Sequence, residues 1–166
     1  MKKSVLLVEY DEPTIANVRE ILASPVYDIT VANDGEAAKK VLATRSFDLV
    51  ITAAMLPRFH GFNLSLHVAE EFPATRIIVI SAIYKGNEYR HQATSQYRAD
   101  DFFEKPLPGA RFSERVRELL GVSEEDLHFA PGTTTTEAPV FDTAKIPSLK
   151  KIEEEEKKFT SEDLFG

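Results

Sequence analysis

Cysteine is absent from the chain, and no apolar run is long enough to cross a bilayer. The first absence excludes disulfide bridges and thiolate metal sites and is compatible with a reducing cytosol. A transmembrane helix needs roughly 20 consecutive apolar residues, and no segment approaches that length. The apolar stretch Val5–Val8 is too short for a signal peptide and runs straight into acidic residues. We therefore expect a cytoplasmic protein without a membrane partner.

Positive charge is also scarce, because the formal net charge is -7 at pH 7. Nucleic-acid binding depends on a basic footprint, and no basic stripe, helix-turn-helix signature or zinc-ligand spacing is present. We therefore expect no direct contact with nucleic acid, and a protein or a small molecule is the default partner. The chain has 166 residues, of which 43% are hydrophobic and 28% charged, as is typical of one packed domain with an appendage.

Short apolar runs alternate with longer segments of helical periodicity. Runs such as VLLV, LVIT and IIVI are rich in β-branched residues, as expected of parallel strands covered on both faces. In the first helical segment Ile15, Val18 and Leu22 recur at the spacing of an amphipathic helix. This alternation predicts a doubly wound α/β sheet with right-handed crossovers. The predicted strands are Ser4–Val8, Tyr27–Ala32, Leu49–Thr52, Ile77–Ser81 and Asp101–Phe103, and the predicted helices are Pro13–Ala23, Gly35–Thr44, Gly61–Glu71, Asn87–Arg98 and Ala110–Leu119.

Residues that begin and end helices stand at the predicted boundaries. Asp11 or Glu12, directly before a proline, suits the first turn of a helix, and Asp34 is expected to cap the second helix. Gly121 is expected to end the fifth helix, since glycine is frequent at that position. Gly61 is expected to adopt a turn conformation with positive φ.

The composition changes after about Val122. Ser123–Leu127 is expected to form one more helical turn, and His128–Pro147, which contains PGTTTTEAP, is typical of a flexible linker. The charge-dense segment that follows is expected to be a disordered acidic tail or, alternatively, partly helical from Ser148 to Lys158. We therefore divide the chain into a domain of residues 1–121, a turn and linker of residues 122–147, and a tail of residues 148–166.

Polar side chains collect at the carboxyl ends of the predicted strands, where open α/β sheets bind their ligands. The residues that this arrangement brings together are Glu9, Tyr10 and Asp11 after the first strand, Ala53 after the third, Ser81 at the end of the fourth and Lys105 after the fifth. Acids, a hydroxyl and an ammonium in one crevice would suit a phosphate group or Mg²⁺.

Over residues 2–121 the chain resembles the receiver (CheY-like) domain of two-component response regulators. The resemblance is carried by VLLVEYDEP, DLVITAAMLPRFHGF, IIVISA and ADDFFEKPL, which stand in the family's order. It implies a flavodoxin-like (βα)5 sandwich with parallel sheet order 2-1-3-4-5. It also implies that acids after the first strand hold Mg²⁺ and that an Asp ending the third strand accepts a phosphoryl group. Ser81 and Lys105 match the residues that contact this group.

Ala53 stands where the resemblance places the phosphoacceptor aspartate. A methyl group is neither a nucleophile nor a metal ligand, so aspartyl phosphate cannot form there. Neighbouring Thr52 should face the other side of the sheet, because successive strand residues alternate. Tyr10 replaces the second metal-binding acid, and Asp11 either supplies that carboxylate through a one-residue insertion or caps the first helix. We therefore expect Mg²⁺ binding to be weak or absent, with no other cofactor, no further metal and no catalytic residue.

Four residues match the family positions that respond to phosphorylation. Ser81 and Lys105 either retain a conformational relay or, without a phosphoryl group, cap the loop after the fourth strand and neutralise Glu9. The resemblance implies a cis bond between Lys105 and Pro106. Phe102 stands at the position of the aromatic switch and, lacking a hydroxyl, is expected to stay in the core.

The resemblance also implies a partner face made by the fourth helix, the fifth strand and the fifth helix. Aromatic residues near this face are expected either to contact a partner or to be half-buried packing residues, and they are Tyr84, Tyr89, Tyr97 and Phe103. His60, in place of the acid commonly found before Gly61, is expected to be an exposed loop histidine without a metal or phosphate role.

The sequence favours a pseudo-receiver, a non-enzymatic signalling module that cannot be phosphorylated at position 53. It would act by binding a protein, with a second copy of the chain as one candidate. Two alternatives stay open. One is a conventional phospho-Asp response regulator with an engineered Asp→Ala change, or one truncated before an output domain. The other is a flavodoxin-like small-molecule binder or enzyme, which the acidic, glycine-free segment Glu9–Glu12 disfavours.

Overall fold

The computed structural model describes residues 2–128, which form a five-stranded parallel sheet of order β2-β1-β3-β4-β5. This order and the flavodoxin-like (βα)5 arrangement confirm the expected fold. The strands are β1 (Lys3–Val8), β2 (Tyr27–Ala32), β3 (Leu49–Ala53), β4 (Arg76–Ser81) and β5 (Asp101–Glu104). The helices are α1 (Glu12–Ile21), α2 (Gly35–Thr44), α3 (Gly61–Glu71), α4 (Asn87–His91) and α5 (Gly109–Leu120), with a π-helical turn at Gln92–Gln96 and a 3-10 turn at Asp126–His128.

The predicted acidic tail and almost all of the predicted linker lie outside the described residues. Contacts with the domain continue past Gly121, since Val122 is buried and the hydroxyl of Ser24 donates to the carbonyl oxygen of Leu127. None of the helices within residues 2–128 combines the length and the apolar character of a membrane-spanning segment.

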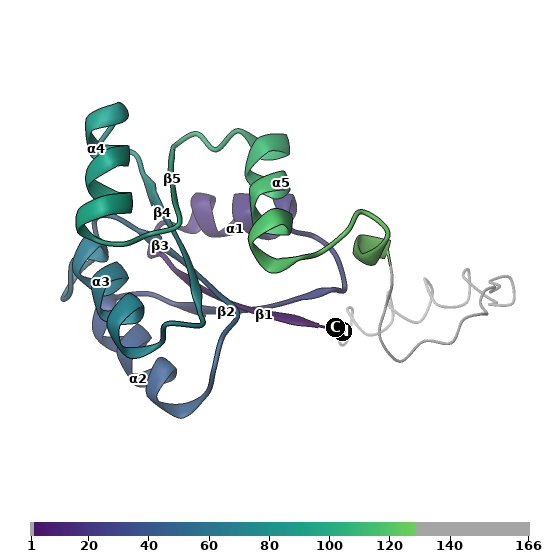
Figure 1. Cartoon of the computed structure of the whole chain (residues 1–166), viewed down its shortest axis with the longest axis horizontal. Helices are drawn as coiled ribbons and strands as arrows, with labels where there is room; N and C mark the ends of the chain where they lie inside the picture. Colours follow the sequence, from purple (N-terminus) through teal and green to yellow (C-terminus); the bar gives the residue numbers. More distant parts are fainter. Residues whose placement is uncertain (1, 129–166) are drawn as a thin grey trace, which may run out of the picture. The chain divides into compact units, whose positions relative to one another are not determined.

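Helices cover both faces of the sheet, with α1 and α5 on one face and α2, α3 and α4 on the other (Figure 1). Neighbouring strand residues therefore enter different apolar layers. Leu7 packs with the residues of α1 and α5, and Leu6 packs with those of α2 and α3. Both side chains are fully buried. This two-sided burial explains why the central strands are almost continuously apolar in sequence.

The predicted caps are confirmed. The carboxylate of Asp11 accepts hydrogen bonds from the amide and the hydroxyl of Thr14 at the start of α1. Asp34 accepts a hydrogen bond from the amide of Ala37 at 2.7 Å at the start of α2. Gly121 ends α5 with φ 68°, in the left-handed region that glycine enters without strain.

The fourth helix differs from the prediction. The sequence predicts one continuous helix, Asn87–Arg98, whereas α4 ends at His91 and a wider π-helical turn follows. Within that turn, the hydroxyls of Thr94 and Ser95 donate to backbone carbonyl oxygens of the preceding turn. Hydroxyl groups that bond back to the helix in this way compete with the regular ladder of backbone hydrogen bonds. Periodicity alone does not reveal that competition.

The prediction that Gly61 has a positive φ is wrong. Among the described residues, the glycines with a positive φ are Gly86 and Gly121. Its lack of a side chain serves a close approach instead. A Cβ at this position would lie 1.8 Å from the carbonyl oxygen of Ala53. The amide of Gly61 also donates to the carbonyl oxygen of Ala54 at 2.9 Å. The start of α3 is therefore held directly against the end of β3.

The substitution Gly61→Ala tests this close approach. We expect a loss of about 1–3 kcal/mol in the free energy of unfolding, because the added methyl group must push two backbone segments apart. Urea denaturation of the full chain measures the loss. Gly109→Ala is the matched control, since a Cβ there would first meet the side chain of Ile21 at 3.8 Å. Equal stability of the two variants would contradict the proposed role of Gly61.

Candidate functional site

A cleft of about 220 Å³ lies at the carboxyl ends of β1, β3, β4 and β5. It brings together all six residues that the sequence places at the strand ends. The lining residues are Glu9, Tyr10, Asp11, Ala53, Ala54, Met55, Ile80, Ser81, Ala82, Ile83 and Lys105. The sequence does not mark Met55 and Ile83 as site residues, because loop residues without reactive groups give no chemical signal.

An ion pair between Glu9 and Lys105 lies in the cleft. The Lys105 ammonium donates to Oε1 of Glu9 at 3.1 Å, and the Glu9 residue is only 1% exposed. Oε2 of Glu9 accepts the backbone amides of Tyr10 at 3.2 Å and Asp11 at 3.1 Å. Both carboxylate oxygens are therefore engaged. A buried carboxylate requires such compensation, and the expectation that Lys105 neutralises Glu9 is confirmed.

The two residues after Glu9 also line the cleft, and they differ in the groups that they offer to it. Asp11 uses its Oδ2 atom to cap α1, with the Thr14 hydroxyl at 2.6 Å, and this hydrogen bond lowers the pKa of Asp11 below its ordinary value. Of the two interpretations of Asp11, the structure supports the helix cap. Tyr10 is 52% exposed and offers only a phenol.

The residues present do not fit the Mg²⁺ ion that the family resemblance implies. Within residues 2–128 no group of three acidic, histidine or cysteine side chains lies close enough to hold a metal. The side chain of Ala53 has no donor atom, both oxygens of Glu9 are engaged, and Oδ2 of Asp11 caps α1. Mg²⁺ is usually held by one or two carboxylates together with waters, and here Glu9 is already paired with Lys105 while position 53 supplies no carboxylate.

Ser81 and Thr52 occupy the places that the sequence predicts. The Ser81 hydroxyl is buried and accepts the amides of Ile83 at 3.2 Å and Tyr84 at 2.8 Å, so it caps the loop after β4. Thr52 is buried and does not line the cleft. The bond between Lys105 and Pro106 is cis, as expected.

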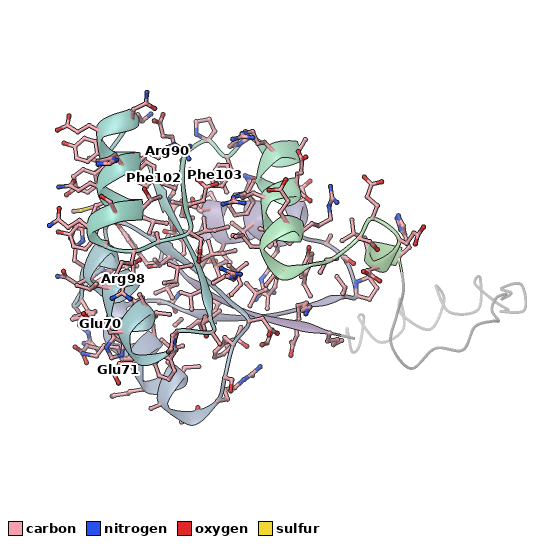
Figure 2. The ribbon with its side chains drawn as sticks, in the orientation of Figure 1. Glu70, Glu71, Arg90, Arg98, Phe102 and Phe103 are labelled. Carbon is pink, nitrogen blue, oxygen red and sulfur yellow. The ribbon has the colours of Figure 1, made fainter. Side chains whose placement is uncertain are left out.

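Phe102 and Phe103 enter the two apolar layers on either side of β5 (Figure 2). Phe102 is 1% exposed, which confirms its predicted place in the core. Phe103 is 2% exposed and packs edge-on against Phe112 with ring centroids 5.1 Å apart. Of the two interpretations of Phe103, this arrangement supports packing, because the alternation along β5 turns the side chain toward α5.

The three tyrosines near α4 are half-buried and pack on the layer that contains Phe62 and Phe102. The rings of Tyr84 and Tyr89 are 5.0 Å apart, and Tyr97 stacks on Phe62 at 5.0 Å. This arrangement supports the packing interpretation of these residues.

His60 is not the exposed loop residue that the sequence predicts. Its Nδ1 atom accepts the amide of Phe62 at 3.2 Å and caps α3, and its ring stacks on Phe62. Burial lowers the pKa of His60, so the ring favours the neutral form that can accept this hydrogen bond. A histidine cap has no strong sequence signal, since Ser, Thr, Asp and Asn dominate this position.

A second ionic cluster joins α4, β5 and α5, and no pattern in the sequence predicts it. Asp101 is 7% exposed, and its two carboxylate oxygens accept hydrogen bonds from Arg90 on α4 and from Arg115 on α5, the latter at 2.7 Å. The Arg90 guanidinium lies over the ring of Phe103 (Figure 2). Arg90 and Arg115 are 11 and 14 positions from Asp101 in the chain, so only the fold brings the three residues together.

Comparison with known proteins agrees with this geometry. The model of the response regulator receiver domain family matches residues 5–117. The alkaline phosphatase synthesis transcriptional regulatory protein PhoP of Bacillus subtilis is 28% identical over 124 residues, covering 75% of this chain and 51% of that protein. Response regulator ArlR of Staphylococcus epidermidis is 31% identical over 118 residues, covering 70% and 52%. The chain thus spans about half the length of these curated relatives.

Solved structures of receiver domains share the fold. The signal receiver domain of an HD domain-containing protein from Pseudomonas fluorescens superposes with a TM-score of 0.67 at 25% identity, covering 72% of this chain and 88% of that one. The receiver domain of the Francisella response regulator 1452 superposes with a TM-score of 0.66 at 23% identity, covering 72% and 98%.

Removing the ammonium from the buried pair should destabilise the domain. We expect Lys105→Met to lower the free energy of unfolding by roughly 3–5 kcal/mol, because it leaves the Glu9 carboxylate buried without a counter-charge. The double variant Glu9→Gln/Lys105→Met should regain much of this loss, as a double-mutant cycle by urea denaturation will show.

Lys39→Met is the control for this cycle, because it breaks the exposed pair with Glu36 on α2. It should cost at most about 1 kcal/mol. If Lys105→Met lowers the free energy of unfolding no more than Lys39→Met does, the pair of Glu9 and Lys105 does not stabilise the cleft.

Proposed function

Because the chain belongs to the response regulator receiver domain family, a family of two-component signalling, we propose that it acts as a pseudo-receiver. Such a domain binds a protein partner without accepting a phosphoryl group at position 53. The observation that carries the proposal is the methyl group of Ala53, which lines the cleft beside the paired Glu9 and Lys105. No carboxylate of the cleft is free at the end of β3 to attack phosphorus.

The electrostatics of the cleft support the same proposal. Two carboxylates, Glu9 and Asp11, face one ammonium, Lys105, which leaves a surplus of negative charge. A phosphoryl donor would be repelled by this surplus unless a metal ion bridged the charges, and both oxygens of Glu9 are already engaged by Lys105 and by backbone amides. We accordingly propose that the domain works without Mg²⁺ or another cofactor and is not an enzyme.

The rest of the chain enters the proposal as connecting or accessory sequence. We assign the signalling module to residues 1–121, and we propose that residues 122–147 and 148–166 link it to another element or bind a second partner. A cytoplasmic location would agree with the family membership.

We place the partner on the surface formed by α4, β5 and α5. The ionic cluster of Arg90, Asp101 and Arg115 fixes these three elements relative to one another, which pre-organises the surface for binding. A groove of about 290 Å³ lies there, lined by Arg90, Phe103, Glu104, Pro106, Pro108 and Arg111. The partner is a protein, and a second copy of this chain is one candidate.

A conventional phospho-Asp regulator with a substituted position 53 remains the second candidate. The observation that favours it is the retention of Ser81 and Lys105 in the cleft, at the positions that match the family. These two residues also have structural partners of their own, so their retention does not require phosphorylation.

Phosphorylation assays test the proposal directly. After incubation of the full chain with acetyl phosphate and Mg²⁺, we expect an unchanged intact mass, because no nucleophilic carboxylate ends β3. Beryllofluoride with Mg²⁺ should likewise leave the amide NMR signals of the cleft residues in place. A phosphoryl group mapped to any residue of the cleft would overturn the proposal.

Two variants separate the candidates. If position 53 is the only defect, Ala53→Asp alone should show a Mg²⁺-dependent response to beryllofluoride in the same NMR measurement. We expect the response only in Ala53→Asp/Tyr10→Asp, because the ion also needs a second carboxylate. Ala82→Asp places an acid in the same cleft but off β3, and it serves as the matched control. A response of the single variant would favour the conventional regulator.

Photo-cross-linking tests the partner face. A benzoylphenylalanine in place of Tyr89, which is half-buried on α4, should form a covalent adduct with the partner in cells. The same group in place of the exposed Ala43 on α2 should form none, because α2 packs beside β1 and β2, at the opposite edge of the sheet from β5. Adducts at position 43 without adducts at position 89 would rule out this placement.

A further inference from the structure

Three large apolar side chains are exposed within residues 2–128, and all three surround the same cleft. Ile83 is 66% exposed, Tyr10 52% and Met55 40%. They come from three different loops, which follow β4, β1 and β3. Single apolar residues scattered over a surface are ordinary, whereas a group of them around a hollow indicates a contact surface.

The interior of the cleft would accept an apolar group. Its lining includes the small side chains of Ala53, Ala54 and Ala82, so the volume of about 220 Å³ is not filled from within. Ala53 contributes a methyl group where a longer side chain would occupy part of this space. The charged groups of Glu9 and Lys105 already satisfy each other and have little need of a charged ligand.

The charge at the mouth of the cleft is negative. Asp11 lines the mouth. Its carboxylate accepts a hydrogen bond from the Thr14 hydroxyl, which lowers the pKa of Asp11 and favours the ionised form. Neither Asp11 nor the exposed Glu12 forms a salt bridge within the described part of the chain. Lys105 is the only basic residue of the lining, and Glu9 engages it. A partner with a basic residue beside its apolar group would be complementary to this arrangement.

We propose that this mouth, formed by Tyr10, Met55 and Ile83, binds a protein segment. The segment inserts one aliphatic or aromatic side chain between these residues and places a lysine or arginine beside Asp11. A protein segment suits the site better than a small molecule, because the apolar atoms stand at the rim in contact with solvent. The mouth is separate from the α4, β5 and α5 surface.

The probe for this proposal is a random peptide library displayed on phage and selected on the immobilised full chain. We expect the enriched peptides to carry an apolar residue within one helical turn of a lysine or arginine. In fluorescence anisotropy with individual peptides, Ile83→Asp should weaken binding by about tenfold or more, as expected when an anchor contact at an interface is lost. Ile83→Ser should weaken it as well, without adding a charge.

Matched variants control for charge and for folding. Ala43→Asp adds the same charge to an exposed residue of α2 and should leave peptide binding unchanged. Asp11→Asn keeps a good helix cap and should weaken binding and reduce its dependence on salt. Circular dichroism verifies that each variant is folded.

Three outcomes would overturn the proposal. The first is the failure to enrich any peptide, and the second is the enrichment of acidic peptides. The third is a loss of peptide affinity in Ala43→Asp equal to the loss in Ile83→Asp. The library contains no phosphoryl donor, so the result is independent of whether position 53 can be phosphorylated.

Discussion

The buried ion pair between Glu9 and Lys105 is the interaction on which the site depends. It joins the loop after β1 to the loop after β5, and it supplies the counter-charge without which a carboxylate with 1% exposure would be strongly unfavourable. The pair is complete in itself, because the backbone amides of Tyr10 and Asp11 satisfy the second oxygen. A site of this kind keeps its shape with an uncharged residue at position 53. The pairing of Glu9 with Lys105 therefore does not require a charged side chain at position 53.

Much of the fold could be predicted from the sequence, because it depends on local patterns. The fully buried pair Leu6 and Leu7 shows why an unbroken apolar run means a strand covered on both faces. Asp34 and Gly121 act on the backbone of their own turns, so their roles follow from residue type and place. The cleft was predictable for a topological reason, since parallel strands bring their carboxyl ends to one edge of the sheet.

What the sequence could not predict depends on distances between elements. The role of Gly61 follows from the carbonyl oxygen of Ala53, which no property of Gly61 itself reveals. Asp101 finds its two arginines on different helices, and Phe103 is buried because α5 covers that face of β5. His60 acts as a cap only because the fold half-buries its ring and favours the neutral form.

The contact between Gly61 and β3 has a consequence for how freely the surface of this domain can vary. With only a hydrogen atom between the first residue of α3 and the carbonyl oxygen of Ala53, the helix is anchored to the strand by the main chain itself. The register of α3 therefore owes little to the identity of its outward-facing side chains. Substitutions at those positions should leave the attachment of α3 to β3 intact, so the chemistry of that helix surface can change without a change in the sheet beneath it.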